Sequence, residues 1–169
     1  MDVTVQDEHR WLEKLAGDWT WELDAGSMPD LPAGKVTGTE RVRSLGGVWV
    51  VCEGSSDYGG EVSESIMTLG FDPAVGRFVG TYAGSMMHHL WIYSGGELDR
   101  EGDALRLEAE GPSFEDQSKH VPYRDTIAFR SPDHRVMTSS YRRDDGTWHQ
   151  FMEMHYRRAG APGPAGGGS

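Results

Sequence analysis

The stretch that decides the fold is Leu15-Ala16-Gly17-Asp18-Trp19-Thr20-Trp21-Glu22, where a helical pattern gives way to strand patterns. Upstream, over residues 4–16, apolar side chains recur at helical spacing, and Gly17 can end the helix. A helix this short is marginal in water, so it must pack on another element. We therefore expect the helix to cover one end of the structure that the strands form.

Downstream of this stretch, short strand patterns follow one another, separated by turns rich in Gly, Asp and Pro. The strongest hairpin signal is Asp144-Asp145-Gly146. Many short strands with one helix favour a closed antiparallel barrel, because closure removes exposed sheet edges. The pattern predicts an all-β, ten-stranded barrel with strands at residues 18–24, 35–44, 47–54, 63–71, 77–84, 86–93, 104–110, 122–130, 134–142 and 147–157.

We predict one domain over residues 1–158, followed by a disordered Gly- and Pro-rich tail at 159–169. Loops at 25–34 and 111–120 are expected on the rim. The chain has 169 residues and a formal net charge of −11, which disfavours nucleic acid and anionic membranes as partners. Neither a membrane-spanning apolar run nor a signal peptide is evident, and the single cysteine excludes an intrachain disulfide. These features predict a cytoplasmic protein.

Alternation along the strands predicts which side chains face the barrel interior. Tyr123, Asp125, Ile127 and Phe129 form a clear inward face. Because burying ionisable groups without partners is costly, inward carboxylates and histidines among aromatic and Met side chains predict a functional cavity. The expected ligand-binding residues are Glu53, Met67, Tyr82, Met87, His89, Trp91, Tyr93, Tyr123, Met137, Ser139, Tyr141, His149, Phe151, Glu153 and His155.

Candidate acid–base groups follow from the same faces. Glu153 and His155 lie two residues apart on one predicted face, close enough to shift each other's pKa, and Asp125 and His89 are further candidates. They would serve a cofactor-independent isomerase, cyclase or hydrolase. The alternative is a satisfied polar network that stabilises the core. No metal site is predicted, because adjacent histidines such as His88-His89 point to opposite faces of a strand.

The motif Gly17-Asp18-Trp19 resembles the Gly-x-Trp opening of the calycin superfamily, which includes lipocalins, fatty-acid-binding proteins and nitrobindins. In those barrels an Arg near the end of the last strand packs on the Trp, which implies that role for Arg157 or Arg158. The resemblance to nitrobindins also suggests an alternative in which His155 ligates a haem.

A closer resemblance covers nearly the whole of residues 9–158. It is to the bacterial DUF1579 family, which is uncharacterised in general, and it implies a lipocalin-like barrel without an assigned activity. The segments that carry it are His9-Arg10-Trp11-Leu12, Leu45-Gly46-Gly47-Val48-Trp49, Ile66-Met67-Thr68-Leu69-Gly70-Phe71-Asp72-Pro73, Gly84-Ser85-Met86-Met87, His89-Leu90-Trp91, Tyr123-Arg124-Asp125 and His155-Tyr156-Arg157-Arg158.

The leading hypothesis from the sequence is a barrel that binds a small, mainly apolar ligand with a polar group and needs no cofactor. The enzyme and the haem protein are the two alternatives. A third role, as a structural or homodimerising module, would follow if Met86, His88 and Ile92 formed an outward patch.

Overall fold

The computed structural model describes residues 3–24 and 34–160. Most of the predicted rim loop, at 25–33, and most of the predicted tail, at 161–169, lie outside the described residues. No helix among the described residues is long and apolar enough to cross a membrane.

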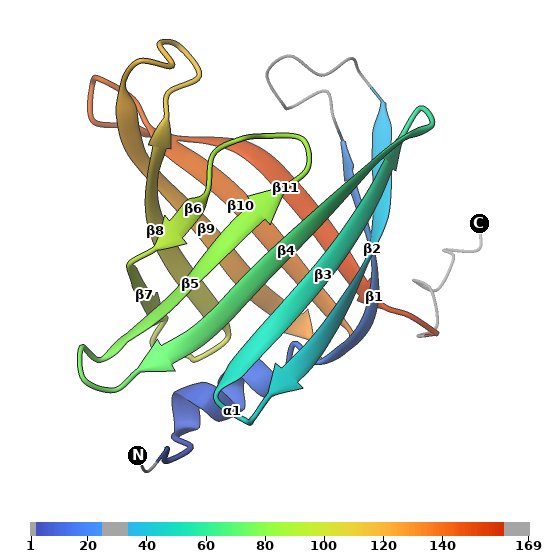
Figure 1. The fold of residues 1–169 in the computed structure, drawn as a ribbon, viewed down its shortest axis with the longest axis vertical. Coiled ribbons are helices and arrows are strands. Elements are labelled where there is room, and N and C mark those ends of the chain that lie inside the picture. The colour runs from blue at the N-terminus through green and yellow to red at the C-terminus, as the bar shows by residue number, and fades with distance from the viewer. Residues whose placement is uncertain (1–2, 25–33, 161–169) are drawn as a thin grey trace, which may run out of the picture.

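Eleven antiparallel strands form one continuous sheet that curls into a barrel (Figure 1). Consecutive strands pair from β1 to β6 and from β7 to β11, and the first strand pairs with the last. The strands are β1 Gly17–Asp24, β2 Lys35–Leu45, β3 Trp49–Tyr58, β4 Glu61–Asp72, β5 Arg77–Gly84, β6 Trp91–Tyr93, β7 Gly95–Leu98, β8 Ala104–Pro112, β9 His120–Ser131, β10 His134–Arg142 and β11 Trp148–Arg158.

The barrel is nearly closed where the chain passes from β6 to β7. β6 pairs with β5 and β7 pairs with β8, so the two edges of the sheet are consecutive segments of the chain. Between them, Ser94 N–H donates to Glu108 O at 3.3 Å. The sequence prediction of ten strands was wrong here, because the expected strand at 86–93 shortens to β6 and the glycine-rich stretch after it forms β7.

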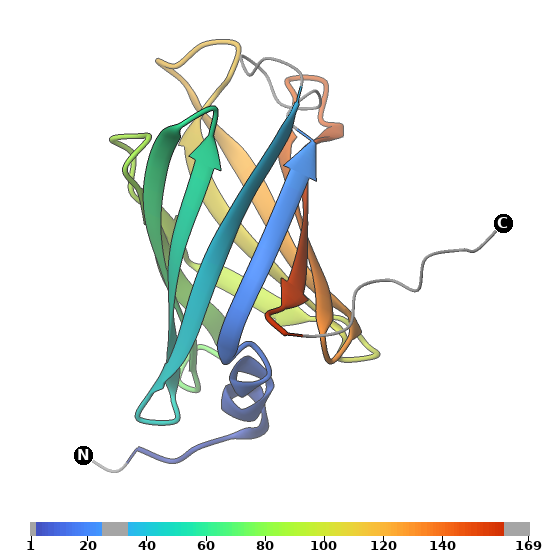
Figure 2. The same cartoon turned by 90° about the vertical axis from the view of Figure 1, so that its right-hand side faces the viewer.

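Helix α1, Asp7–Glu13, covers one end of the barrel, and it is shorter than the predicted 4–16 (Figure 2). His9 anchors its first turn, since His9 Nδ1 accepts from Gln6 N–H at 2.9 Å and Nε2 lies 3.1 Å from Phe71 O. Trp11 Nε1–H donates to Gly102 O at 2.6 Å, and its ring packs edge-on against Phe78 and Phe129. The helix is therefore tied to strands on several sides, as expected for a short helix that cannot persist alone.

The junction after the helix closes the barrel as well. Trp19 is buried, and its Nε1–H donates to Leu15 O at 2.8 Å. The Arg158 guanidinium lies 4.3 Å from the Trp19 ring centroid and donates to Ala16 O at 2.7 Å. Of the two arginines predicted for this position, Arg158 is the one that packs on Trp19.

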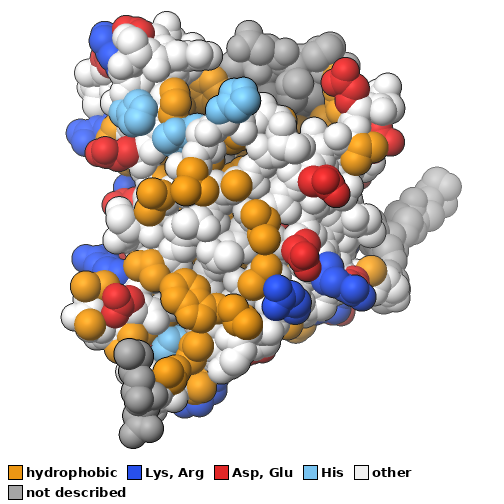
Figure 3. All heavy atoms as spheres, in the orientation of Figure 1, with side chains coloured by type: hydrophobic (Ala, Val, Ile, Leu, Met, Phe, Trp, Pro, Cys, Tyr) orange, Lys and Arg blue, Asp and Glu red, His pale blue; other side chains and the backbone are white. Residues whose placement is uncertain are grey.

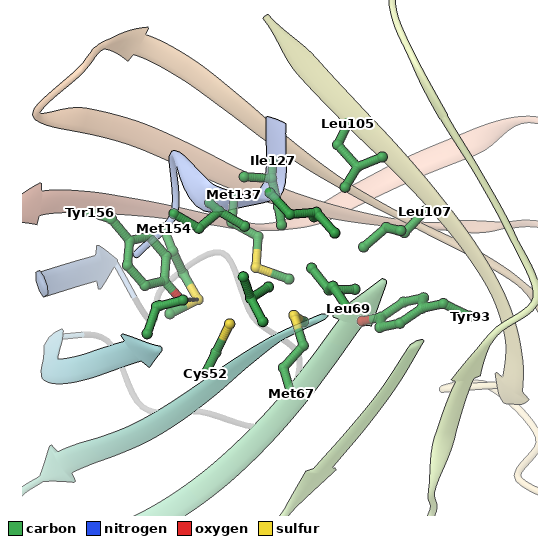
Figure 4. Packing of buried hydrophobic residues seen from close by; sticks show 14 of the residues in the cluster. Cys52, Met67, Leu69, Tyr93, Leu105, Leu107, Ile127, Met137, Met154 and Tyr156 are labelled. Atoms are coloured by element: carbon green, nitrogen blue, oxygen red, sulfur yellow. Dashed lines mark hydrogen bonds between the residues drawn. The ribbon is translucent and has the colours of Figure 1, made fainter. Parts of the chain in front are cut away.

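Side chains fill the helix-side half of the barrel. The buried cluster begins at Leu12, Leu15 and Trp19 and continues through Leu69 and Leu105. Higher up, Cys52, Met67, Met137 and Met154 converge on the barrel centre from β3, β4, β10 and β11 (Figure 4). The helix-side half is therefore a packed core.

Three predicted inward residues instead face outward. A register irregularity at Ser139/Ser140 of β10 lets β11 place Phe151 and Met152 toward the interior in succession, which turns Glu153 and His155 outward. On β3, Cys52 pairs with the inward Val42 and Met67, so Glu53 points outward, where it lies 3.9 Å from Arg43. The sequence was ambiguous on β3, because Trp49–Cys52 is apolar on both faces.

Apolar side chains also gather on the outer face of the barrel over β3 to β6 (Figure 3). Ile92 is 57% exposed and Met86 52% exposed, and Ile66 and Trp49 add to this surface from β4 and β3. The outward patch that the sequence hypothesis of a dimerising module required is thus partly present.

Candidate functional site

The mouth-side half of the barrel, opposite α1, differs from the packed half. Several inward-facing side chains there keep part of their surface accessible, although the strands around them are fully paired. On β3 to β5 these residues are small or polar, whereas β6, β9, β10 and β11 contribute aromatic rings and β9 also contributes a carboxylate. The half-buried inward residues include Ser56, Ser63, Ser65, Tyr82, Trp91 and Asp125. Solvent therefore reaches the interior of this half.

Asp125 is the central polar group of this half. Alternation places it inward on β9, as predicted, opposite Leu107 of β8 and Ser139 of β10. Tyr93 O–H donates to Asp125 Oδ2 and Ser139 O–H donates to Oδ1, each at 2.5 Å. Burial raises the pKa of the Asp125 carboxyl, and the two hydrogen bonds offset only part of that effect.

The raised pKa predicts how Asp125 affects stability. The folded protein holds this proton more tightly than the unfolded chain, so the carboxyl's contribution to stability is fully present at acid pH and is lost as pH rises through the folded pKa. We expect the free energy of unfolding of Asp125→Asn, relative to wild type, to increase from pH 4 to pH 8. Urea titrations of both proteins across this range measure it, and a constant difference would contradict it.

An aromatic wall lies one step closer to the mouth on the same three strands. The wall includes Trp91, Tyr123 and Tyr141. Each lies two positions along its strand from Tyr93, Asp125 or Ser139, on the same face and about 7 Å away. The Trp91 and Tyr123 ring centroids are 4.7 Å apart, and those of Tyr123 and Tyr141 are 6.0 Å apart. The remaining rings of the wall are Phe151 of β11 and Phe114 of the β8–β9 loop, whose centroids are 5.0 Å apart.

A buried ion pair lies inside the barrel, next to Trp19. The Arg135 side chain runs from β10 across the Tyr156 ring, 3.9 Å from its centroid, and reaches Glu40 of β2. It also lies 4.7 Å from the Trp19 centroid. Arg135 is 3% exposed and Glu40 13% exposed, so the pair is buried beside Trp19 and Tyr156.

Cys52 lies in the packed core near this pair and gives a chemical test of how closed the core is. The thiol is buried, and burial raises its pKa, with the nearby Glu40 adding to the effect. We expect Ellman's reagent to label Cys52 about 1,000-fold more slowly in the native protein than in urea, because labelling must await opening of the barrel. Ser55→Cys in a Cys52→Ser background is the accessible control. Rapid native labelling of Cys52 would mean that the open region extends into the core.

A groove of about 790 Å³ lies on the outer wall, across β11, β1, β2 and β3. Its lining is polar and mostly outward-facing, with Thr20, Thr37 and Ser55 among its hydroxyl groups. His155 lines it, and its Nε2 is 3.0 Å from Glu153 Oε1 while its Nδ1 is 3.1 Å from His134 Nε2. Burial, the nearby Arg157 and His155 itself lower the pKa of His134.

The four predicted acid–base residues do not form one site, although Glu153 and His155 contact each other. Asp125 lies inside the barrel, His89 lies at the mouth, where its Nε2 is 3.3 Å from Glu110 O, and Glu153 and His155 lie outside. One substrate cannot contact the inner and outer faces of the β-sheet at the same time. His155 also cannot ligate a haem held within the barrel. Among the described residues no three His, Cys, Asp or Glu side chains are arranged to hold a metal ion.

Most predicted ligand-binding residues do line the interior or its mouth. Met87 contacts the mouth-side wall, since Trp91 Nε1–H lies 3.1 Å from its sulfur, and His149 packs against Tyr141 at 5.4 Å. The inward residues are Met67, Tyr82, Trp91, Tyr93, Tyr123, Met137, Ser139, Tyr141 and Phe151, and the outward ones are Glu53, Glu153 and His155.

Sequence reasoning missed the ion pair and the last ring. Arg135 shares the alternating face of Met137 and Ser139, so period two alone would have placed it inside. Glu40 likewise shares one alternating face with Val36 and Val42. Phe114 carries no such signal, because it lies in a loop.

Comparison with solved structures supports the barrel architecture. The S-type phycobiliprotein lyase CPES from Guillardia theta is similar with a TM-score of 0.56 at 12% identity, over 95% of this chain and 100% of that chain. Two barrels in structures bound to DFHBI are more distant. EF1p2_mFAP2b has a TM-score of 0.41 at 14% identity, over 89% of this chain and 98% of that chain. The redesigned barrel mFAP1 has a TM-score of 0.40 at 13% identity, over 88% and 99%.

No curated protein matches the chain. The profile of a family described as "Protein of unknown function (DUF1579)" matches residues 4–158, which is nearly the whole of the barrel and its helix. The chain therefore belongs to the DUF1579 family.

Proposed function

We propose that this protein binds a small, mainly apolar molecule with a polar group in the mouth-side half of its barrel. The observation that carries the proposal is the pairing of an aromatic wall with a carboxylate that has no cationic partner among the described residues and lies two residues deeper on the same strands. Apolar rings bury the body of a ligand, and a few placed polar groups orient it. The small side chains of β3 and β4 leave room opposite the rings.

Binding of naphthalen-1-ylmethanol, measured by isothermal titration calorimetry, tests the proposal. Its two fused rings match the aromatic wall, and its hydroxyl can reach a carboxylate below. At about 0.5 kcal/mol per non-hydrogen atom, the dissociation constant would be on the order of 10–100 µM. Absence of binding up to millimolar concentration would contradict the proposal.

Two adjacent serines distinguish the interior from the outer groove. Both serines border the groove, but alternation on β3 points the Ser56 side chain inward, beside Ser63, and the Ser55 side chain outward. We expect Ser56→Phe to abolish binding by filling the accessible space, and Ser55→Phe to leave it unchanged. The opposite result would place the ligand in the outer groove. Circular dichroism of both variants controls for folding.

The geometry also supports a calycin-type barrel as part of this proposal. Arg158 packs on Trp19 next to a helix that covers the same end, as the resemblance to that superfamily implies. The fold likeness to the lyase, at 12% identity, does not identify the ligand.

A further inference from the structure

We propose that the interior selects organic cations over neutral and anionic molecules of the same shape, with Asp125 as the counter-ion. This inference rests on the proposed function and adds the charge of the ligand to it. The ligand class is an amine or quaternary ammonium carried on an apolar or aromatic body.

The first observation is that Asp125 has no cationic partner among the described residues. Its two oxygens accept from the hydroxyls of Tyr93 and Ser139, which carry no charge. Inside the described part of the barrel, Arg135 is already paired with Glu40. At the helix end, Arg158 pairs with Asp133 at 3.2 Å. A deprotonated Asp125 therefore leaves the accessible half with an uncompensated negative charge.

The second observation is the arrangement of rings around that charge. Trp91 and Tyr123 lie on the next inward position toward the mouth, and Tyr82 of β5 lies beside Trp91 as its cross-strand partner. Ring faces attract cations, most strongly where solvent is largely excluded. A carboxylate beneath aromatic rings thus stabilises a cation on two sides. The same arrangement repels a carboxylate or sulfonate ligand.

The third observation is that the net charge of the protein favours a cationic ligand. The chain carries a net charge of −11, which attracts cations and slows the approach of anions. That long-range attraction is screened by salt, whereas a contact with Asp125 inside the barrel is screened much less. The two contributions can therefore be separated experimentally.

The test uses three probes with one ring system: naphthalen-1-ylmethylammonium, naphthalen-1-ylmethanol and 1-naphthoate, titrated into the whole protein by calorimetry at 0.15 M salt. We expect the ammonium probe to bind at least about ten-fold more tightly than the alcohol, and naphthoate to bind least. The affinity of the ammonium probe should rise from pH 5 to pH 8, because the bound ammonium favours the deprotonated Asp125 carboxyl. Asp125→Asn should reduce the preference for the ammonium probe to about two-fold or less.

Glu53→Gln is the matched control, since it removes one negative charge from the outer face of the same barrel and should keep the full preference. An equal loss of preference in Glu53→Gln would assign the effect to overall charge and overturn the inference. Binding of the alcohol with no preference for the ammonium would overturn the inference but leave the proposed function standing. Failure of all three probes would overturn both. If Asp125→Asn does not fold, a flat pH profile of the ammonium probe in the wild-type protein would itself overturn the inference.

Discussion

Replacing Arg135 by methionine is expected to lower the free energy of unfolding by about 3–5 kcal/mol, measured by urea unfolding at pH 7. The substitution keeps apolar contact with the Tyr156 ring but leaves Glu40 buried without its partner. An uncompensated buried carboxylate must either stay desolvated or take up a proton, and both outcomes cost stability. Because Glu40 retains some exposure, we expect the lower part of that range.

The double variant Glu40→Met with Arg135→Met separates the pair from its parts. Removing both charges eliminates the desolvation cost together with the attraction, so its stability should lie within about 1–2 kcal/mol of wild type. Arg77→Met provides the surface comparison, because Arg77 pairs with Glu97 in an exposed site and should cost less than about 1 kcal/mol. A double variant as unstable as Arg135→Met alone would contradict this account.

The position of Asp125 was predictable because β9 alternates cleanly. One face of this strand carries Ile127 and Phe129, and the other carries Arg124 and Arg130. The first face is therefore the buried one. The same regularity held on β8, and the opening at Trp19 was correctly expected to meet an arginine from the last strand. The faces of β8 and β9 depend on local period, which the sequence contains, whereas the arginine at Trp19 was implied by the resemblance to calycin barrels.

The face of β11 was not predictable in the same way. A strand with Phe151, Met152 and Met154 carries apolar residues on both alternating faces, and a single irregularity opposite Ser139 reverses all side chains beyond it. Such an irregularity depends on how β10 and β11 pair, which is a tertiary property. The sequence therefore placed Glu153 and His155 inside, and the haem alternative and the Glu153–His155 part of the acid–base alternative depended on that error.

The hydrogen bonds of Asp125 were also beyond the sequence. Tyr93 is distant in the chain and lies on a three-residue strand at the edge of the sheet. It reaches Asp125 only because the barrel closes between β6 and β7. The inward position of Asp125 was thus predictable, whereas its hydrogen bond with Tyr93 depended on how the barrel closes.

Replacing Trp19 by alanine is expected to lower the free energy of unfolding by about 3–5 kcal/mol, measured by urea unfolding at pH 7. Trp19 is 1% exposed, and its loss leaves a cavity beneath the helix and frees Leu15 O from its hydrogen bond. The Arg158 and Arg135 guanidiniums, which lie over its ring, would lose that contact.

Trp148→Ala is the control for Trp19→Ala. Trp148 is 38% exposed and carries Arg124 over its ring at 4.1 Å, so it makes a comparable cation contact without filling the core. Its loss should cost about 1 kcal/mol or less. Because Trp19 lies at the helix end, Trp19→Ala should leave binding of naphthalen-1-ylmethanol within about two-fold of wild type under conditions where the variant is folded. A larger loss of binding would mean that the two ends of the barrel are coupled, and that the packed core between them transmits changes from the helix to the mouth.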